Sequence, residues 1–315
     1  MKIEALREHA ATKDKFQSVQ DYADFARSYL EFIAEADALQ AVIVARNETN
    51  YRFFQYGRAA DYQITRPING ALFYDVSEFE QAFAHFQAVL AAIRDREVAD
   101  PTLRPTMGRV IYTIQQSIGA ALDALPAGAS NRARKVNGDL FERLIGQLLC
   151  DIGIDCVSGV LRVPVTDLDG TELFKMAYQH DLMVRVDGEL KAIGSVKTSS
   201  KDRIDKIFMD KFLYSRLTGT DLPHIAIFLN DVQRAGREPD YRVISTFLPG
   251  HFKGYTVKLN PLDGVYYCDI RPAMKTDPLL AAHIKTIDSL FYDDCGQFAA
   301  ARGQSLSDLE LDVES

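Results

Sequence analysis

Residues 180–203 have the sequence "HDLMVRVDGELKAIGSVKTSSKDR". Two short apolar runs flank a tight turn at 187–189, which predicts a β-hairpin, and the polar residues after the second run predict the start of a helix. Asp181 lies on the first predicted strand, and Ser195 and Lys197 lie at the end of the second. Because side chains alternate along a strand, Ser195 and Lys197 face the same way. The hairpin therefore predicts an aspartate beside a lysine at one edge of a sheet.

The segments around the hairpin alternate between predicted helices and strands. In the predicted helices apolar residues recur at intervals of three and four residues, whereas the predicted strands are short apolar runs bounded by turn residues. The predicted elements are helices over 136–153 and 202–219 and strands over 156–165, 173–186, 190–197, 224–231 and 242–250. This order predicts an α/β fold in which a central mixed β-sheet is flanked by α-helices.

The first third of the chain has a different pattern. Amphipathic periodicity predicts helices over 18–47, 75–98 and 106–125, with Ser77 as an N-cap. The loop "PAGASN" then predicts a boundary near residue 128. We therefore expect a helical N-terminal region at 1–128, an α/β core at 129–302 and a mobile acidic tail at 303–315.

The composition predicts a globular protein. The 315 residues are 47% hydrophobic and 25% charged, which is enough apolar material for one large domain or two smaller ones. No apolar run approaches the roughly 18 to 20 residues of a membrane span, and the charged start is unlike a signal peptide, so we expect a cytoplasmic protein. The four cysteines form no CxxC pair and are expected to be free thiols.

The charge is unevenly distributed along the chain. A net charge of −8 argues against indiscriminate coating of nucleic acid, but residues 191–216 hold seven Lys or Arg against three Asp, a local surplus of four positives. The sequence contains neither GxxxxGK[ST] nor GxGxxG and no cluster with zinc-like spacing, so nucleotide-driven and zinc chemistry are unsupported.

The paired aspartate and lysine suit phosphodiester hydrolysis. Asp181 supplies a carboxylate that can hold a divalent metal, and the ammonium of Lys197 can position the attacking water or help to deprotonate it. Mg²⁺ prefers oxygen ligands and usually needs a second carboxylate. Asp210, on the following predicted helix, and Glu142, on the helix before the sheet, are the candidates.

These residues resemble a known family. Asp181, the run Ser195-Val-Lys197 and an acid 13 residues after the lysine are similar to the PD-(D/E)xK nuclease superfamily. More narrowly they resemble type II restriction endonucleases of the EcoRII, PspGI and NgoMIV type, which recognise CCGG or CCNGG sites. In that group the acid before "xK" is often Ser and its carboxylate comes from the next helix, so the resemblance gives Ser195 the vacated position and Asp210 the displaced acid. Glu142 is similar to the acid on the first core helix.

The resemblance also implies residues for base recognition. Lys201-Asp202-Arg203 is similar to the group's Arg-Glu-Arg-like triplet, with donor, acceptor and donor character suited to a GG:CC step. His180 replaces the proline of the "PD" pair, Asp210 is shorter than the usual Glu, and Lys201 gives a point charge in place of an arginine fork.

The implied protein is a homodimeric, Mg²⁺-dependent type IIP restriction endonuclease. It would cut double-stranded DNA at a CCNGG-like palindrome containing CC/GG, with flanking bases and flipping of a central base as further options, and would leave 5′-phosphates. It would act beside a companion DNA methyltransferase. The implied roles are metal binding by Asp181 and Asp210, water positioning by Lys197, assistance by Glu142 and support by Ser195. The implied fold is a restriction-endonuclease-like core, and the N-terminal region would aid DNA contact or dimer formation.

The aromatic stretch before residue 75 adds a weaker hypothesis. Members of the resembled group can flip a central base, and side chains in this stretch are possible agents of such flipping. The residues concerned are Phe53, Phe54, Tyr56, Arg58 and Tyr74. Packing between helices is the alternative role.

Other interpretations remain open at this point. A D…SxK pattern also occurs by chance, "TSSKDRID" is a good helix start with Ser199 or Ser200 as N-cap, and single acids can be solvated helix-face residues. Structural roles are expected for His180, His224 and His251. Two functional alternatives are a structure-specific repair or recombination nuclease and a non-catalytic DNA-binding module of the same fold.

Overall fold

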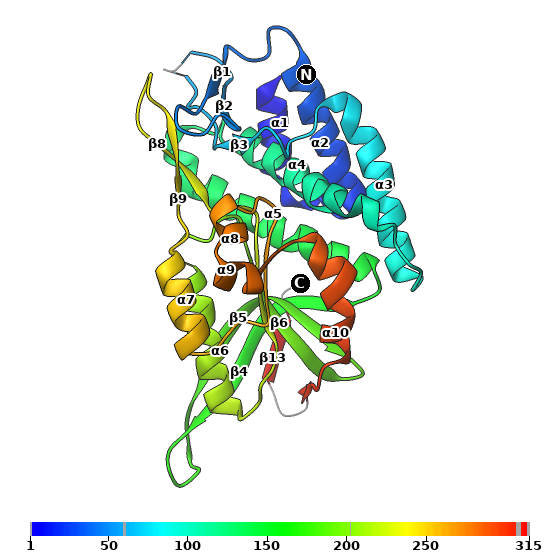
Figure 1. Ribbon diagram of the computed structural model, residues 1–315, viewed down its shortest axis with the longest axis vertical. Coiled ribbons are helices and arrows are strands. Elements are labelled where there is room, and N and C mark those ends of the chain that lie inside the picture. The colour runs from blue at the N-terminus through cyan, green and yellow to red at the C-terminus, as the bar shows by residue number, and fades with distance from the viewer. Residues whose placement is uncertain (1, 59–60, 202, 307–309, 314–315) are drawn as a thin grey trace.

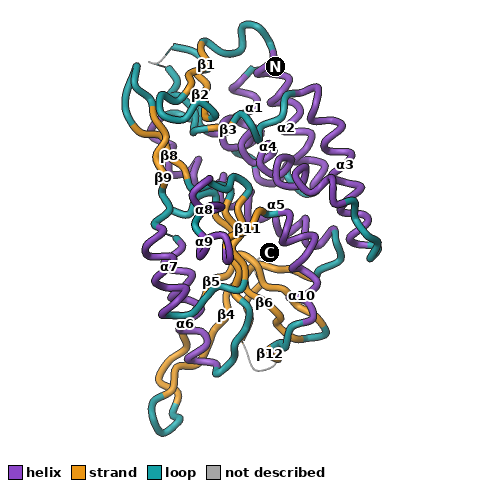
Figure 2. The backbone as a smooth tube through the Cα atoms, viewed as in Figure 1, coloured by secondary structure: helices purple, strands orange, loops and turns teal. Residues whose placement is uncertain are grey.

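The computed structural model describes residues 2–58, 61–201, 203–306 and 310–313. Its centre is a mixed β-sheet with the strand order β11-β10-β7-β6-β5-β4-β13, and β12 pairs with β6 beside that path (Figures 1 and 2). The strands are β4 (Asp155–Thr166), β5 (Glu172–Val186), β6 (Glu189–Lys197), β7 (His224–Phe228), β10 (Gly264–Tyr267), β11 (Ile284–Thr286), β12 (Gln304–Ser305) and β13 (Glu310–Val313).

The predicted hairpin is formed by β5 and β6. Its turn residues Asp187 and Gly188 have φ angles of 49° and 79°, the left-handed values that a two-residue turn of the primed type requires. β4, β5 and β6 are antiparallel, whereas β6, β7, β10 and β11 are parallel. The parallel strands β6, β7 and β10 therefore end at one edge of the sheet, which is the edge that holds Lys197.

Helices cover both faces of this sheet, which confirms the predicted fold class. Leu140 of α5 (Ser130–Asp151) packs in the same apolar cluster as Leu182 and Val196 of the hairpin, and α10 (Cys295–Ala300) joins this face. On the other face, helices α6 (Ile204–Thr218) and α7 (Pro249–Lys258) pack Phe208 and Phe252 against β7.

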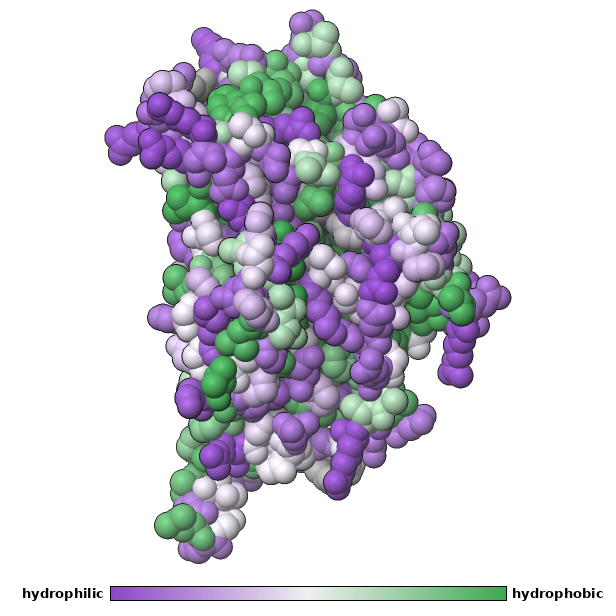
Figure 3. Space-filling view, viewed as in Figure 1, coloured by the Kyte–Doolittle hydropathy of each residue, from purple (hydrophilic) through white to green (hydrophobic). Residues whose placement is uncertain are grey.

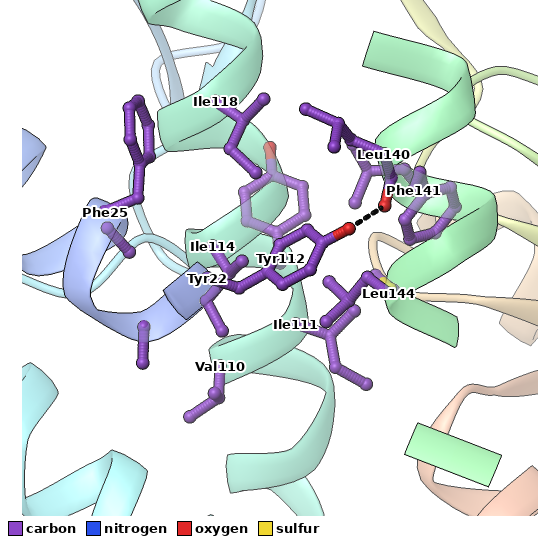
Figure 4. Packing of buried hydrophobic residues seen from close by; sticks show 14 of the residues in the cluster. Tyr22, Phe25, Val110, Ile111, Tyr112, Ile114, Ile118, Leu140, Phe141 and Leu144 are labelled. Carbon is purple, nitrogen blue, oxygen red and sulfur yellow. Dashed lines mark hydrogen bonds between the residues drawn. The ribbon is translucent and has the colours of Figure 1, made fainter. Parts of the chain in front are cut away.

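The N-terminal region shares its core with the sheet. Helix α4 (Arg104–Leu122) lies between the other N-terminal helices and α5, and Tyr22 donates a hydrogen bond to the carbonyl of Leu140 at 3.0 Å (Figure 4). One apolar cluster runs without interruption from α1 through α4 to Val196. The remaining elements are α1 (Ile3–Ala10), α2 (Val19–Ala34), α3 (Val76–Arg94), α8 (Pro272–Thr276), α9 (Pro278–His283), β1 (Ala41–Val44), β2 (Tyr51–Gln55), β3 (Ile68–Asn69), β8 (Val232–Ala235), β9 (Arg242–Ser245), the 3-10 turns Lys13–Lys15, Pro101–Leu103 and Ala127–Ala129, and the π-helical turn Leu290–Asp294.

Three local predictions were wrong. Residues 41–44, predicted as helix, form strand β1, because a run of β-branched side chains favours a strand once it pairs with β2. The N-cap of α3 is Asp75, which accepts from the amide of Glu78, and not Ser77. Helix α6 begins only at Ile204, so neither predicted serine caps it.

Four described residues of the acidic tail form strand β13 (Glu310–Val313) at the edge of the sheet. β13 pairs with β4 in antiparallel register, and Glu310 and Asp312 form ion pairs with Lys175 (2.8 Å) and Arg162 (2.9 Å). Basic side chains on the β4–β5 hairpin thus compensate the negative charges of the acidic segment at the edge of the sheet. The mobility of the tail stays a prediction.

The described surface is mainly hydrophilic on the face shown in Figure 3. Of the helices in the described ranges, none combines the length and apolar character needed to cross a membrane. All four cysteines are free, as expected, with Cys268 and Cys295 buried and Cys150 exposed.

The shared core makes a stability prediction. Replacing the fully buried Leu140 by alanine (Leu140→Ala) should lower the free energy of unfolding by about 2 to 5 kcal/mol, because it leaves a cavity where α5 meets the N-terminal helices. Urea denaturation followed by circular dichroism should still give a single transition. Val98→Ala, at a side chain 97% exposed, is the control and should change stability by less than about 0.5 kcal/mol. A separate unfolding transition for the N-terminal helices would contradict the shared core.

Candidate active site

Three charged side chains meet at the edge where β6 ends. The ammonium Nζ of Lys197 donates to Asp181 Oδ2 at 2.6 Å and to Glu142 Oε1 at 2.7 Å. The side chains are 29%, 11% and 28% exposed, respectively, so the group is largely withdrawn from water yet still accessible. We call Glu142, Asp181 and Lys197 the carboxylate–lysine cluster. The predicted meeting of Asp181 and Lys197 is what the structure shows.

The local backbone explains this convergence. Paired residues of β5 and β6 end at Leu182 and Gly194, and beyond that point the carboxylate of Asp181 accepts a hydrogen bond from the amide of Val196 at 2.8 Å. The carboxylate thus takes a place that a backbone carbonyl would hold in a continued ladder. Glu142 reaches the same point from α5, whose neighbouring residues Leu144 and Ile145 are buried against the core.

The electrostatics of the cluster follow from its burial. Desolvation raises the pKa of Glu142, the nearby charge of Asp181 raises it further, and Lys197 opposes both, which leaves this pKa at about 7. Burial alone would lower the pKa of Lys197, but the two carboxylates outweigh that effect and raise it above its usual value. The lysine is therefore a permanent cation near neutral pH.

The cluster opens onto a cleft of about 700 Å³ between the N-terminal region and the sheet edge. Its walls come mainly from residues 63–67, 133–142, 197–201, 203 and 229–234. We call this space the basic cleft, because seven Lys or Arg line it against three acids. The basic residues are Arg66, Arg134, Lys135, Lys197, Lys201, Arg203 and Arg234. A cleft lined by one sign of charge attracts polyanions even when the whole chain is acidic.

Two of the three predicted recognition residues line the same cleft as the cluster. Lys201 and Arg203 both line the basic cleft, and the ammonium of Lys201 donates to Gln233 Oε1 at 3.2 Å. Arg203 is the residue that precedes the first turn of α6. Asp202, predicted as the acceptor of the triplet, lies outside the described residues.

Asp210 is not brought to the cluster. Its Oδ2 accepts from Lys206 one turn earlier on α6, at 2.7 Å. Within the described ranges, no three His, Cys, Asp or Glu side chains are grouped closely enough to hold a metal, so Asp210 does not complete a triad with Asp181 and Glu142. The metal role of Asp210 stays a prediction without support from this geometry.

Ser195 remains where the sequence placed it. It lies on β6, in register with Ala226 of β7, and is half-buried two residues before Lys197. Its proposed supporting role stays a prediction.

The aromatic residues proposed for base flipping belong to the core instead. Phe53, Phe54, Tyr56 and Tyr74 are 0 to 8% exposed. Tyr56 also donates a hydrogen bond to the carbonyl of Ala120 at 2.8 Å, which fixes its hydroxyl inside. Side chains held in this way do not reach a DNA surface, so the flipping hypothesis is wrong for these four. The fifth residue, Arg58, is exposed and pairs with Asp61.

The histidines divide into two kinds. His180 and His224 are buried, with ring centroids 6.4 Å apart, and desolvation lowers their pKa values to about 3 and about 4. They are neutral packing residues, as expected. His251 is exposed beside Asp205.

Sequence reasoning missed one wall of the basic cleft. Arg66, Arg134, Gln233 and Arg234 were not predicted, because they come from segments that are distant in sequence from the hairpin. The only local signal was the density of arginines at 52–66 and 132–134.

Comparisons with known proteins place this fold. No protein-family model matches the sequence, and no curated protein matches it. Among solved structures, the type IIP restriction endonuclease Kpn2I superposes with a TM-score of 0.67 at 14% identity, over 96% of this chain and 99% of that one. A complex of restriction endonuclease PspGI with substrate DNA matches with a TM-score of 0.40 at 14% identity, over 70% and 91% of the chains. The first likeness establishes a restriction-endonuclease fold; the second adds nothing to that assignment.

The cluster predicts an unusual titration in metal-free buffer. The side-chain carboxyl carbon of Glu142, followed by NMR, should titrate near pH 7 and not near 4.5, because burial and Asp181 both favour its neutral form. In Asp181→Asn one of these two causes is lost, so the pKa of Glu142 should fall. The spectrum of Glu142→Gln identifies the signal. A Glu142 that titrates near its ordinary pKa would show that the cluster is open to water.

Proposed function

We propose that this protein is a type IIP restriction endonuclease that hydrolyses double-stranded DNA with Mg²⁺. The observation that carries the proposal is the ammonium of Lys197 shared by two carboxylates at the floor of the basic cleft. A carboxylate pair beside a lysine is suited to phosphodiester hydrolysis, and the cleft supplies the positive surroundings that a DNA backbone requires. The fold shared with Kpn2I, a type IIP restriction endonuclease, supports this assignment.

The two carboxylates fit a magnesium ion. Mg²⁺ is commonly held by one or two carboxylates together with substrate phosphate and water, and the carboxylates of Asp181 and Glu142 lie close together, each bound to the ammonium of Lys197. When bound there, the metal would polarise the scissile phosphate and lower the pKa of a water molecule. In this assignment Glu142 replaces Asp210 as the second carboxylate.

Lys197 is proposed to act as a donor and a fixed charge. In the metal-free protein the two carboxylates raise its pKa, and we therefore propose a protonated donor and not a base for this residue. It would orient the attacking water through a hydrogen bond and neutralise charge that develops on the phosphate. Ser195, on the same strand, would support this placement.

Specificity is proposed to come from the segment after the lysine. Lys201 and Arg203 present donors to the basic cleft, and guanine offers two acceptors, O6 and N7, in the major groove. A CC/GG palindrome, read by a symmetric homodimer, is the recognition site proposed here. The same proposal places the enzyme in the cytoplasm together with a methyltransferase that protects the host DNA.

Digestion of plasmid and genomic DNA tests the proposal. With Mg²⁺ the protein should give discrete fragments with 5′-phosphate ends, and sequencing those ends should reveal one palindrome. Fragments that depend on branched or damaged DNA would instead identify a structure-specific nuclease. Binding without cleavage would identify a non-catalytic module.

The substitution Asp181→Asn separates binding from cleavage. The amide keeps the size of the side chain and an oxygen for the amide of Val196 but loses the charge that holds a metal. Cleavage should fall by about 100-fold or more, since even partners of metal ligands contribute about 10- to 100-fold to activity or metal affinity. Gel-shift affinity for the same DNA should be retained.

The control is Asp37→Asn, at an exposed aspartate in a loop of the N-terminal region. It should cleave like the wild type. An Asp181→Asn enzyme with normal plasmid cleavage would remove Asp181 from the reaction and overturn the metal assignment.

A further inference from the structure

A glutamine on strand β8 shares the recognition surface with Lys201. The carboxamide oxygen of Gln233 accepts from the ammonium of Lys201 at 3.2 Å, and both head groups line the basic cleft. Because an ammonium can only donate, the oxygen of the amide must face the lysine and the NH₂ group must face away from it. The lysine thus fixes which way Gln233 presents its donor and its acceptor.

The backbone around Gln233 is held from both sides. Next to it, Val232 packs against the N-terminal sheet, and Arg234 donates to the carbonyl of Ile64 at 2.7 Å. On the lysine side, the amide of Ser200 donates to the carbonyl of Asn230 at 3.3 Å. A head group on such a support is preorganised, which is what base recognition requires.

Both partners keep unused hydrogen-bonding capacity. Within the part of the chain that the structure describes, the two head groups hydrogen-bond to each other alone. The oxygen of Gln233 then retains a second lone pair and its NH₂ two donors, while the ammonium of Lys201 retains two further donors. An amide with one acceptor and one donor matches N6 and N7 of adenine, and an ammonium matches O6 and N7 of guanine. The pair is therefore able to contact two different purines at the same time.

The two head groups are in contact and can therefore reach neighbouring bases. The lysine nitrogen and the glutamine oxygen are 3.2 Å apart, a hydrogen-bond distance, and successive nucleotides of one strand are about 3.4 Å apart along the helix axis. We infer that Gln233 is a specificity-determining residue that recognises an adenine in the base pair next to the guanine bound by Lys201. This inference rests on the proposed endonuclease function and extends the recognition site beyond its CC/GG core.

The size of the effect follows from the contact. A bidentate amide–adenine pair discriminates against other bases by about tenfold to about 100-fold, so cleavage of wild-type sites should depend on that single neighbouring base pair to the same extent. In Gln233→Ala this preference should disappear while the preference for the core pairs remains.

A second variant changes the preference rather than removing it. Gln233→Glu keeps an oxygen for Lys201 but replaces the NH₂ donor by an acceptor, which no longer suits adenine N7 and does suit the amino group of cytosine. We expect the preferred base at this position to change from adenine to cytosine. A residue that only supports Lys201 would not produce such a change.

The experiment uses full-length protein and duplex oligonucleotides that carry the site found by end sequencing, with the base pairs on either side randomised. Cut molecules and gel-shifted molecules are sequenced separately for the wild type, Gln233→Ala and Gln233→Glu. Gln87→Ala, at an exposed glutamine of α3, is the matched control and should keep the wild-type preferences. Thermal melting confirms that each variant is folded.

The possible outcomes separate this inference from the proposed function. If the wild type cuts at a defined site and both Gln233 variants keep its flanking preference, the role of Gln233 is overturned and the nuclease stands. If DNA is bound selectively but never cut, the proposed function fails, and Gln233 is judged on the bound sequences alone. If DNA is neither cut nor bound, both are overturned.

Discussion

The ammonium of Lys197 between two carboxylates is the interaction on which the site depends. Two carboxylates withdrawn from water repel each other, and leaving either charge unpaired in such a place is costly. One lysine compensates one of the two charges. The buried amide of Val196 also donates a hydrogen bond to Asp181, which stabilises its negative charge. With both carboxylates ionised the cluster carries a formal charge of −1, which is the electrostatic reason for proposing a divalent cation at this point.

The fold brings the charges of the site together from distant parts of the chain. The parallel strands end at the edge that holds Lys197, helix α5 delivers Glu142 to that edge, and the N-terminal region supplies the opposite wall of the basic cleft. The chain as a whole is acidic, yet this one surface is basic. Overall net charge is therefore a poor guide to the partner that such a cleft attracts.

Local patterns predicted the parts of the structure that local forces determine. The hairpin with its Asp-Gly turn, the helix before it and the pairing of Asp181 with Lys197 follow from alternation, turn chemistry and short sequence separation. What failed depended on contacts between distant segments. Strand β1 and the C-terminal strand exist because partners pair with them. Asp210 is a separate case, because it binds Lys206 four residues earlier on the same helix, and its metal role stays a prediction. No sequence pattern pointed to Gln233, because its proposed role depends on a hydrogen bond to a lysine 32 residues away.

The uninterrupted apolar cluster that joins the N-terminal helices to the sheet has a mechanical consequence. The two walls of the basic cleft are attached to the same packed interior, and packed interiors resist deformation. A hinge motion within one chain that widened the basic cleft would have to separate α4 from α5, and it would expose that interior to solvent. Under the proposed function, a DNA duplex must fit a cleft of fixed width, and any closure around it would come from movement between proposed subunits or from deformation of the DNA.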